Sequence, residues 1–146
     1  MKLKELCNRD VVIIEPSDSV VEAAKLMKQY NVGDVIVVNT ESGKIKPIGV
    51  LTDRDIVVEL VADEVDVSTV SVSDIMSYEL ETANEQEDSA DILKIMKRNG
   101  IRRIPVVDDE NTLQGIITVA DILELLSEEQ LDISSILVTP TKDVLS

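Results

Sequence analysis

The chain has 146 residues, 44% of them hydrophobic and 29% charged, which is typical of a globular protein with one domain or two small ones. A net charge of −15 disfavours nucleic acid and anionic membrane surfaces as partners, and we expect neither. The chain has no His and a single Cys, Cys7, which excludes His-dependent catalysis, His-ligated zinc and an internal disulfide. With no apolar run near the roughly 18 residues of a membrane span, these features favour a cytoplasmic location.

The chain contains two copies of one unit. A shift of 69 residues lays residues 4–39 over residues 73–108, and a shift of 66 lays residues 49–56 over residues 115–122. The change of shift falls between Asn39 and Ile48, where turn-forming residues tolerate a change of length. We therefore expect a first unit over residues 1–66, a second over residues 67–132 and a C-terminal tail over residues 133–146.

Each unit is predicted to follow the order β-α-β-β-α. In the first unit, Ser19 followed by Glu22 indicates a helix start, and Asn31 is a suitable left-handed helix end. In the second, Asp88 is the expected N-cap and Gly100 the expected C-terminal cap. Apolar periodicity predicts strands over 11–14, 35–38 and 49–51 with helices over 20–30 and 54–62, then strands over 80–83, 104–107 and 115–117 with helices over 89–99 and 120–126.

A motif of the form Gly-x-x-Thr-x-x-Asp occurs in both units, at the expected turn from strand to helix. Thr followed by an acid three residues later is also a capping box, which is a purely structural role. The two roles are compatible, because a helix N-terminus attracts phosphate and a carboxylate beside it suits a ribose diol. The motif residues are Gly49, Thr52 and Asp55 in the first unit and Gly115, Thr118 and Asp121 in the second.

Five of the 14 basic residues lie within ten positions, 94–103, of the second unit. Those on the predicted helix fit a solvated face. Arg102 and Arg103 instead precede the predicted strand, and they are candidates for bidentate recognition of phosphate. The first unit has Gly33 and Asp34 at the matching positions, so it offers no cation there. Arg54 is a third candidate for phosphate, with a surface ion pair as its alternative role.

Two other features are interpreted as structural. Cys7 aligns with Met76 in the repeat, which predicts a buried apolar role and not a nucleophile. The acidic run over residues 108–110 is interpreted as a solvated turn and not as a metal site.

Taken together, the residues resemble a tandem pair of cystathionine β-synthase (CBS) domains over residues 3–126. The resemblance rests on the duplicated motif, on Ala-x-x-Met followed by Val32 and Gly33, on Ile-Arg-Arg-Ile-Pro-Val-Val-Asp over residues 101–108 and on Asp-Ile-Met over residues 74–76. It implies an α+β (mixed α/β) fold of two units packed with pseudo-two-fold symmetry, and frequently a homodimer. It also implies an adenosine-containing ligand in the cleft between the units.

The resemblance assigns roles to individual residues. In such pairs the motif Asp holds the ribose hydroxyls, the motif Thr lies near ribose or phosphate, apolar residues flank the adenine, and basic residues before the strand reach phosphate. The second unit matches this pattern fully, so we expect unequal occupancy of two sites and a larger role for Asp121 than for Asp55. The implied nucleotide-binding residues are Thr52, Arg54, Asp55, Arg102, Arg103, Ile104, Pro105, Thr118 and Asp121.

These expectations describe a stand-alone regulatory module that is not an enzyme. Its implied ligand is AMP, ADP or ATP, with S-adenosylmethionine and NAD as further candidates, and it would signal through a homodimer or a partner protein. The alternative is a dimerisation or scaffold module without a ligand, in which the motif residues act only as caps. A small hydrolase is disfavoured, because nothing pairs a nucleophile with a base. Apolar residues within 127–146 favour packing on a dimer or exchange between chains.

Overall fold

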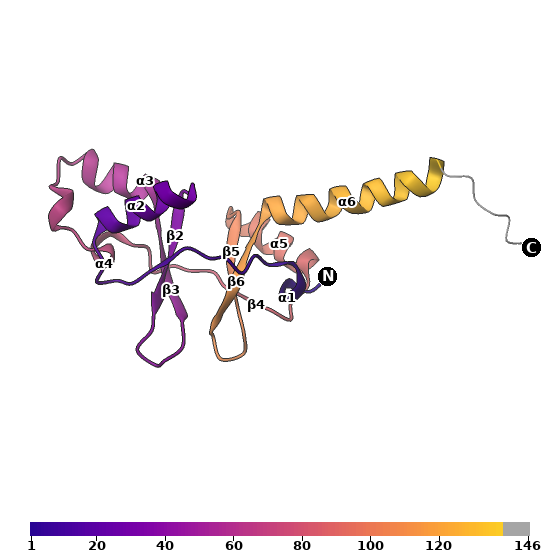
Figure 1. The fold of residues 1–146 in the computed structure, drawn as a ribbon, viewed down its shortest axis with the longest axis horizontal. Coiled ribbons are helices and arrows are strands. Elements are labelled where there is room, and N and C mark those ends of the chain that lie inside the picture. The colour runs from indigo at the N-terminus through magenta and orange to yellow at the C-terminus, as the bar shows by residue number, and fades with distance from the viewer. Residues whose placement is uncertain (139–146) are drawn as a thin grey trace, which may run out of the picture.

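A computed structural model describes residues 1–138 of the chain. It has two lobes, each built around a three-stranded sheet (Figure 1). The central strand of each sheet pairs in parallel with a two-residue strand and antiparallel with the following strand. The fold is therefore mixed α/β, as expected. The strands are β1 (Ile13–Ile14), β2 (Asp34–Asn39) and β3 (Lys46–Thr52) in the first lobe and β4 (Ala83–Asn84), β5 (Arg103–Val107) and β6 (Leu113–Thr118) in the second.

The first long helix of each lobe begins and ends at the predicted caps. In α2 (Val20–Tyr30), the hydroxyl of Ser19 accepts the Glu22 N–H at 3.1 Å. In α5 (Ser89–Asn99), the carboxylate of Asp88 accepts the Ala90 N–H at 2.9 Å. The two helices end at Asn31 and Gly100, which have φ angles of 53° and 66°. Both ends are thus set by local sequence.

The last helix of each lobe differs from the prediction. The expected helix over residues 54–62 is α3 (Asp53–Ile56), which continues as a π-helix over Val57–Val61. The expected helix over residues 120–126 is instead α6 (Val119–Val138), which extends far beyond the lobes (Figure 1). No Gly or Pro occurs between residues 119 and 138 to end it. The first part of the expected tail, residues 133–138, is therefore helical, and residues 139–146 lie outside the described residues. Among residues 1–138, no helix is long and apolar enough to cross a membrane.

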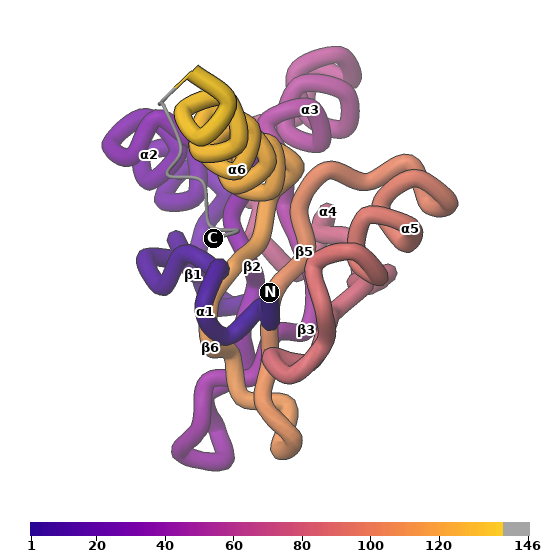
Figure 2. Tube along the Cα trace, turned by 90° about the vertical axis from the view of Figure 1, so that its right-hand side faces the viewer, coloured from indigo at the N-terminus to yellow at the C-terminus, as the bar shows by residue number. Residues whose placement is uncertain are grey.

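Two short helices complete the cores, and each packs on the lobe to which it does not belong in sequence. Helix α1 (Leu3–Leu6) lies beside β6 (Figure 2), and Leu3 is completely buried with Ile92 and Ile104 of the second lobe. Helix α4 (Val72–Ile75) packs in the same way on the first lobe, where Val72 joins the core that contains Val35. The expected division at residue 66 follows the sequence repeats, whereas each core draws on residues from both sides of it.

Reciprocal backbone bridges fix this exchange. Asn8 and Ile116 each donate an N–H to the other's carbonyl, at 2.9 and 2.8 Å. Ser77 and Val50 do the same, at 2.9 and 3.0 Å. The sequence shifts of 69 and 66 map the first pair onto the second. Such reciprocity is what a pseudo-two-fold relation between the lobes produces.

The motif glycines make room for these bridges. A Cβ atom on Gly115 would lie 2.7 Å from both the Asn8 carbonyl oxygen and the Cys7 Sγ. A Cβ atom on Gly49 would collide in the same way with Met76 and the Ser77 backbone. Both Cβ positions are closer than real carbon contacts allow, so the glycine of the repeated motif is needed for packing between the lobes.

Candidate functional site

Two cavities lie between the lobes, and we call them the larger cleft and the smaller cleft. Their volumes are about 620 Å³ and about 180 Å³. The repeat relates them, because the shifts of 69 and 66 map most residues that line one cleft onto residues that line the other. Thr52 in the larger cleft corresponds to Thr118 in the smaller one, and Pro105 corresponds to Ile36.

The larger cleft combines the motif threonine of the first unit with the cations of the second. Thr52 lies at the end of β3, whereas Arg103 begins β5 and Arg102 directly precedes it. Apolar side chains from both lobes form the remaining walls, together with the segment that precedes β4. The apolar lining residues are Ile36, Val50, Leu80, Ile101 and Pro105.

The smaller cleft has a different charge. Thr118 and Asp121 of the second motif line it, opposite the segment that precedes β1. Within residues 1–138, Arg103 is the one basic residue of its lining, against the acids Asp10, Asp34 and Asp121. An anionic group is therefore less well matched here than in the larger cleft.

The structure brings the predicted residues together across the units and not within them. The sequence pattern groups Thr118 and Asp121 with Arg102 and Arg103, since all four belong to the second unit. In the structure, Arg102 faces the larger cleft with Thr52, and Arg103 lines both clefts. The pseudo-two-fold relation causes this crossing, because the start of β5 from one lobe meets the end of β3 from the other.

An ion pair separates the two clefts. Nη1 of Arg103 lies 2.8 Å from Oδ1 of Asp34, and both residues line both clefts. The side chain of Asp34 is 17% exposed and that of Arg103 is 41% exposed. Burial raises the pKa of Asp34 above its usual value, although the neighbouring Arg103 partly offsets this effect.

Both motif Thr–Asp pairs form complete capping boxes. The Thr52 N–H donates to Oδ2 of Asp55 at 2.9 Å, and the Asp55 N–H donates to Oγ1 of Thr52 at 3.0 Å. The corresponding distances between Thr118 and Asp121 are 2.9 and 3.1 Å. The predicted structural role is therefore confirmed. Asp121 lines the smaller cleft, whereas Asp55 lines neither of the two clefts.

Besides Asp55, two predicted site residues line neither cleft. Ile104 is completely buried in the core of the second lobe, whereas the next residue, Pro105, lines the larger cleft. Successive side chains of a strand face opposite sides, so the two neighbours cannot share one role. Arg54 is exposed on α3 and lines neither cleft.

Sequence reasoning missed the acids of the larger cleft. Glu79 and Glu81 lie in the segment before β4 and line the cleft on the same side as Leu80. The repeat held a signal for them, because the shift of 69 lays residues 79–81 over residues 10–12, which line the smaller cleft. With Asp34, they give the larger cleft three acids against two arginines.

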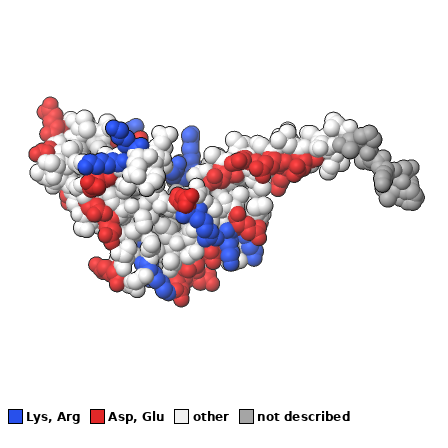
Figure 3. Space-filling model, in the orientation of Figure 1, with Lys and Arg blue, Asp and Glu red and all other residues white. Residues whose placement is uncertain are grey.

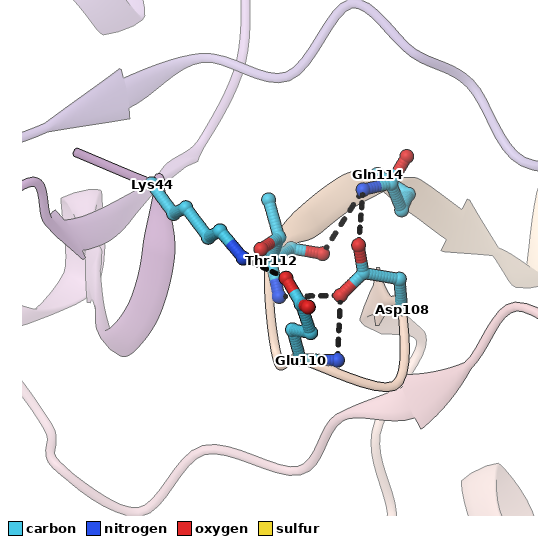
Figure 4. Close-up of polar contacts among 5 residues, drawn as sticks. All are labelled: Lys44, Asp108, Glu110, Thr112 and Gln114. Carbon is cyan, nitrogen blue, oxygen red and sulfur yellow. Dashed lines mark hydrogen bonds and ion pairs between the residues drawn. The ribbon is translucent and has the colours of Figure 1, made fainter. Parts of the chain in front are cut away.

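The hairpin loops of the two lobes also meet. The N–H of Leu113 donates to the Ile45 carbonyl at 2.8 Å, and Lys44 forms an ion pair with Glu110 (Figure 4). The carboxylate of Asp108 accepts the N–H groups of Glu110 and Thr112, both at 2.9 Å. Asp108 thus orders the acidic loop, in agreement with its interpretation as a turn.

Cys7 packs against the core of the second lobe. It lies beside the buried cluster that contains Leu3. Burial raises the pKa of its thiol, which disfavours the reactive thiolate. These observations agree with the predicted packing role.

Comparisons with known proteins agree with this geometry. The family model of the CBS domain matches residues 3–62 and 72–128. The CBS domain-containing protein YhcV of Bacillus subtilis is 40% identical over 120 residues, which are 82% of this chain and 81% of that protein. Some curated relatives are longer than this chain. An uncharacterised protein of Methanopyrus kandleri is 38% identical, and the chain spans 60% of its length. An inosine-5′-monophosphate dehydrogenase of Methanocaldococcus jannaschii is 37% identical, and the chain spans 23% of its length.

Two solved structures have similar folds. A CBS domain pair in complex with 5′-methylthioadenosine and S-adenosyl-L-methionine has a TM-score of 0.73 and 27% identity, with 88% of this chain and 98% of that chain covered. A hexameric CBS-CP12 protein from bloom-forming cyanobacteria has a TM-score of 0.71 and 32% identity, with 84% and 66% covered.

Proposed function

The chain belongs to the CBS domain family as a tandem pair of domains, and on this basis we propose that it is a regulatory module that binds an adenosine-containing ligand in the larger cleft. AMP is the proposed ligand. The observation that carries the proposal is the meeting of apolar walls, Thr52 and the two arginines in one cavity. The similar CBS domain pair that binds 5′-methylthioadenosine and S-adenosyl-L-methionine supports the adenosine class.

The size and lining of the larger cleft suit a nucleotide. Its volume of about 620 Å³ lies within the range of about 300–1,000 Å³ that is usual for small-molecule sites. The apolar walls on either side, including Ile36 and Ile101, would hold the purine. Arg102 and Arg103 would hold the phosphate, because guanidinium groups bind phosphate oxygens in pairs.

The acids of the larger cleft favour one phosphate over three. Asp34, Glu79 and Glu81 share the cavity with the arginines. Two unit charges about 8 Å apart interact by about 2 kcal/mol at the effective dielectric constant near a protein surface. Each phosphate beyond the first adds such repulsion, so we rank AMP above ADP, and ADP above ATP.

We propose one strong site in each chain. The smaller cleft has about 180 Å³, and its lining holds three acids and a single arginine. It therefore offers little room and little positive charge for a second nucleotide. Unequal occupancy remains a prediction. The proposed strong site is the larger cleft and not the smaller cleft that Asp121 lines, so the larger role expected for Asp121 is not part of this proposal.

A ligand in the larger cleft would contact both lobes at once. It would favour the arrangement of the lobes that it binds more tightly. The size of this shift in population is set by the difference between the ligand's affinities for the two arrangements. We propose that this shift is the output, passed through a homodimer or to a partner protein in the cytoplasm, without catalysis by this chain.

Calorimetric titration tests the proposal. Adenosine, AMP, ADP, ATP, NAD, S-adenosylmethionine and 5′-methylthioadenosine would each be titrated into the purified chain. We expect AMP to bind best, with one site per chain. At a concentration of 100 times its Kd, AMP should raise the free energy of unfolding of the protein by about 2.7 kcal/mol. Tighter binding of S-adenosylmethionine would contradict the choice of AMP and indicate that the acids select a cationic ligand. Absence of binding by all seven compounds would favour the scaffold alternative, in which the Thr–Asp pairs act only as caps.

A further inference from the structure

Helix α6 has a long apolar face that no other part of the described chain covers. All residues from 126 to 138 are exposed. Several of them are large and apolar, among them Ile133, which is 60% exposed, and Leu137, which is 80% exposed. An isolated helix shorter than about 12–15 residues is marginal in water, so this protruding segment needs a partner.

Five of the eight exposed large apolar residues of α6 lie on a heptad repeat, whereas Leu131, Ile136 and Val138 lie off it. Successive positions are separated by four, three, four, three and four residues, which is the spacing of a coiled-coil seam. Five of the six positions are apolar and the fourth is Gln. The seam consists of Val119, Leu123, Leu126, Gln130, Ile133 and Leu137.

The charges of α6 lie mostly away from this seam. The helix has five acids and neither Lys nor Arg. Figure 3 shows the acidic side chains along one edge of α6 and uncharged side chains along the other. On one flank of the seam, positions 120, 127 and 134 are Ala, Ser and Ser, which allow a second helix to approach closely. Association of two α6 helices along the seam therefore buries apolar surface without bringing most of the acidic side chains close together.

Glu129 and Gln130, near the middle of α6, favour a parallel pair of helices over an antiparallel one. In a parallel, in-register pair, Gln130 meets its own copy and can exchange a hydrogen bond with it, and Glu129 lies near Ser134 of the second copy. An antiparallel pair that aligns all six seam positions would place Gln130 against Leu126 and bring the two Glu129 side chains together. Burial of an unpaired amide and repulsion between like charges disfavour that arrangement.

We infer that α6 joins two copies of this chain through a parallel two-stranded coiled coil along its heptad seam. The occupant of the apolar face is thus a second α6. This interface is distinct from the proposed nucleotide cleft and does not depend on it. It also explains why α6 continues well beyond the lobe that it leaves.

The test compares two substitutions on the same helix. Ile133→Asp places a charge in the seam, whereas Leu131→Asp places the same charge at a residue that is 69% exposed and lies off the seam. Neither residue belongs to a core, so folding should be unaffected. Analytical sedimentation without nucleotide should show a dimer for the wild type and for Leu131→Asp. For Ile133→Asp, the Kd of the dimer should rise at least about 30-fold, because residues at the centre of an interface dominate its affinity.

Chemical cross-linking tests the orientation. Two Cys residues introduced by Ile133→Cys would face each other in the parallel pair and react with one short bismaleimide. In the antiparallel pair they would be ten residues, or about 15 Å, apart along the axis. Wild-type protein, in which Cys7 is the single thiol, is the control.

Each remaining outcome overturns the inference. A monomeric wild type at tens of micromolar, or a dimer that Ile133→Asp leaves intact, would show that α6 does not form the interface. Equal dissociation by Leu131→Asp would show that general charge and not the seam is responsible. Failure to cross-link at position 133 in an otherwise intact dimer would overturn the parallel arrangement. None of these measurements involves nucleotide, so they fail independently of the proposed function.

Discussion

Asp34 and Arg103 occupy the same position of the two repeats and form an ion pair with each other, 2.8 Å apart, between the two clefts. The shift of 69 residues maps one onto the other. A pseudo-two-fold relation brings equivalent positions face to face, and opposite charges at this position turn that meeting into an attraction. The same pair holds Arg103, a proposed phosphate-binding group, against a carboxylate.

Asp34→Asn should strengthen the binding of AMP by about tenfold. The change removes a negative charge from the larger cleft and frees the guanidinium of Arg103 for phosphate. Calorimetric titration at low salt measures the effect. Glu41→Gln, an equal change of charge at an exposed loop position that lines neither cleft, is the control and should leave the affinity unchanged. Weaker binding by Asp34→Asn would contradict the proposed phosphate position.

Asp34 should also make stability depend on pH in the acid range. Because burial raises its pKa in the folded protein, the folded state keeps this proton at pH values where the unfolded state has released it. Its stabilising contribution is present below about pH 3.9 and is lost as the pH rises through the raised pKa. We expect the free energy of unfolding of the wild type, relative to that of Asp34→Asn, to increase as the pH falls from 7 to about 4. Urea denaturation at several pH values checks this, and a constant difference would refute it.

Arg102→Ala should weaken the binding of AMP and spare that of adenosine. A hydrogen bond to a charged group contributes about 1.5–3 kcal/mol, which corresponds to a loss of about 10- to 100-fold for AMP. Arg98→Ala is the matched control, because Arg98 is exposed on α5 and lines neither cleft. Equal losses for AMP and adenosine would exclude contact between Arg102 and the phosphate.

Gly115→Ala should destabilise the protein by about 1–3 kcal/mol. The new methyl group would collide with the Asn8 backbone, and this backbone is held by two hydrogen bonds to Ile116. Thermal or urea unfolding measures the loss. Gly33→Ala is the control, because its Cβ would meet only the flexible carboxylate of Asp53, at 3.2 Å. Similar stability for the two variants would mean that the approach of Asn8 to Gly115 is not needed for the fold.

The sequence predicted the features that depend on near neighbours. The caps at Ser19, Asp88 and Gly100 could be recognised because a cap needs a specific residue within a few positions of the helix end. The Thr–Asp boxes were recognisable for the same reason. The C-terminal end of α6 was not predicted correctly. The apolar period suggested an end at residue 126, but no Gly or Pro follows within residues 127–138 to end the helix.

The candidate site was predicted in composition but not in arrangement. Thr52, Arg102 and Pro105 were each named from the sequence, and the structure places all three at the larger cleft. Ile104 was named with them, although the alternation of β5 directs it into the core. The acids Glu79 and Glu81 were missed because they belong to neither the Thr–Asp motif nor the basic cluster, although the repeat aligns them with residues 10 and 12 of the smaller cleft.

By itself, the sequence determined the duplication, the β-α-β-β-α order within each unit and the presence of paired Thr–Asp turns, since each follows from residue types at short or regular spacing. It did not predict the short helices α1 and α4. Only the tertiary structure decided that α1 and α4 complete each other's lobes and that the cations of the second unit face the motif threonine of the first. These pairings join residues far apart in the chain, 37 positions for Val35 and Val72 and 101 positions for Leu3 and Ile104. They are fixed by apolar burial and by the close approach of backbone at Gly49 and Gly115, which appear only when two lobes are packed together.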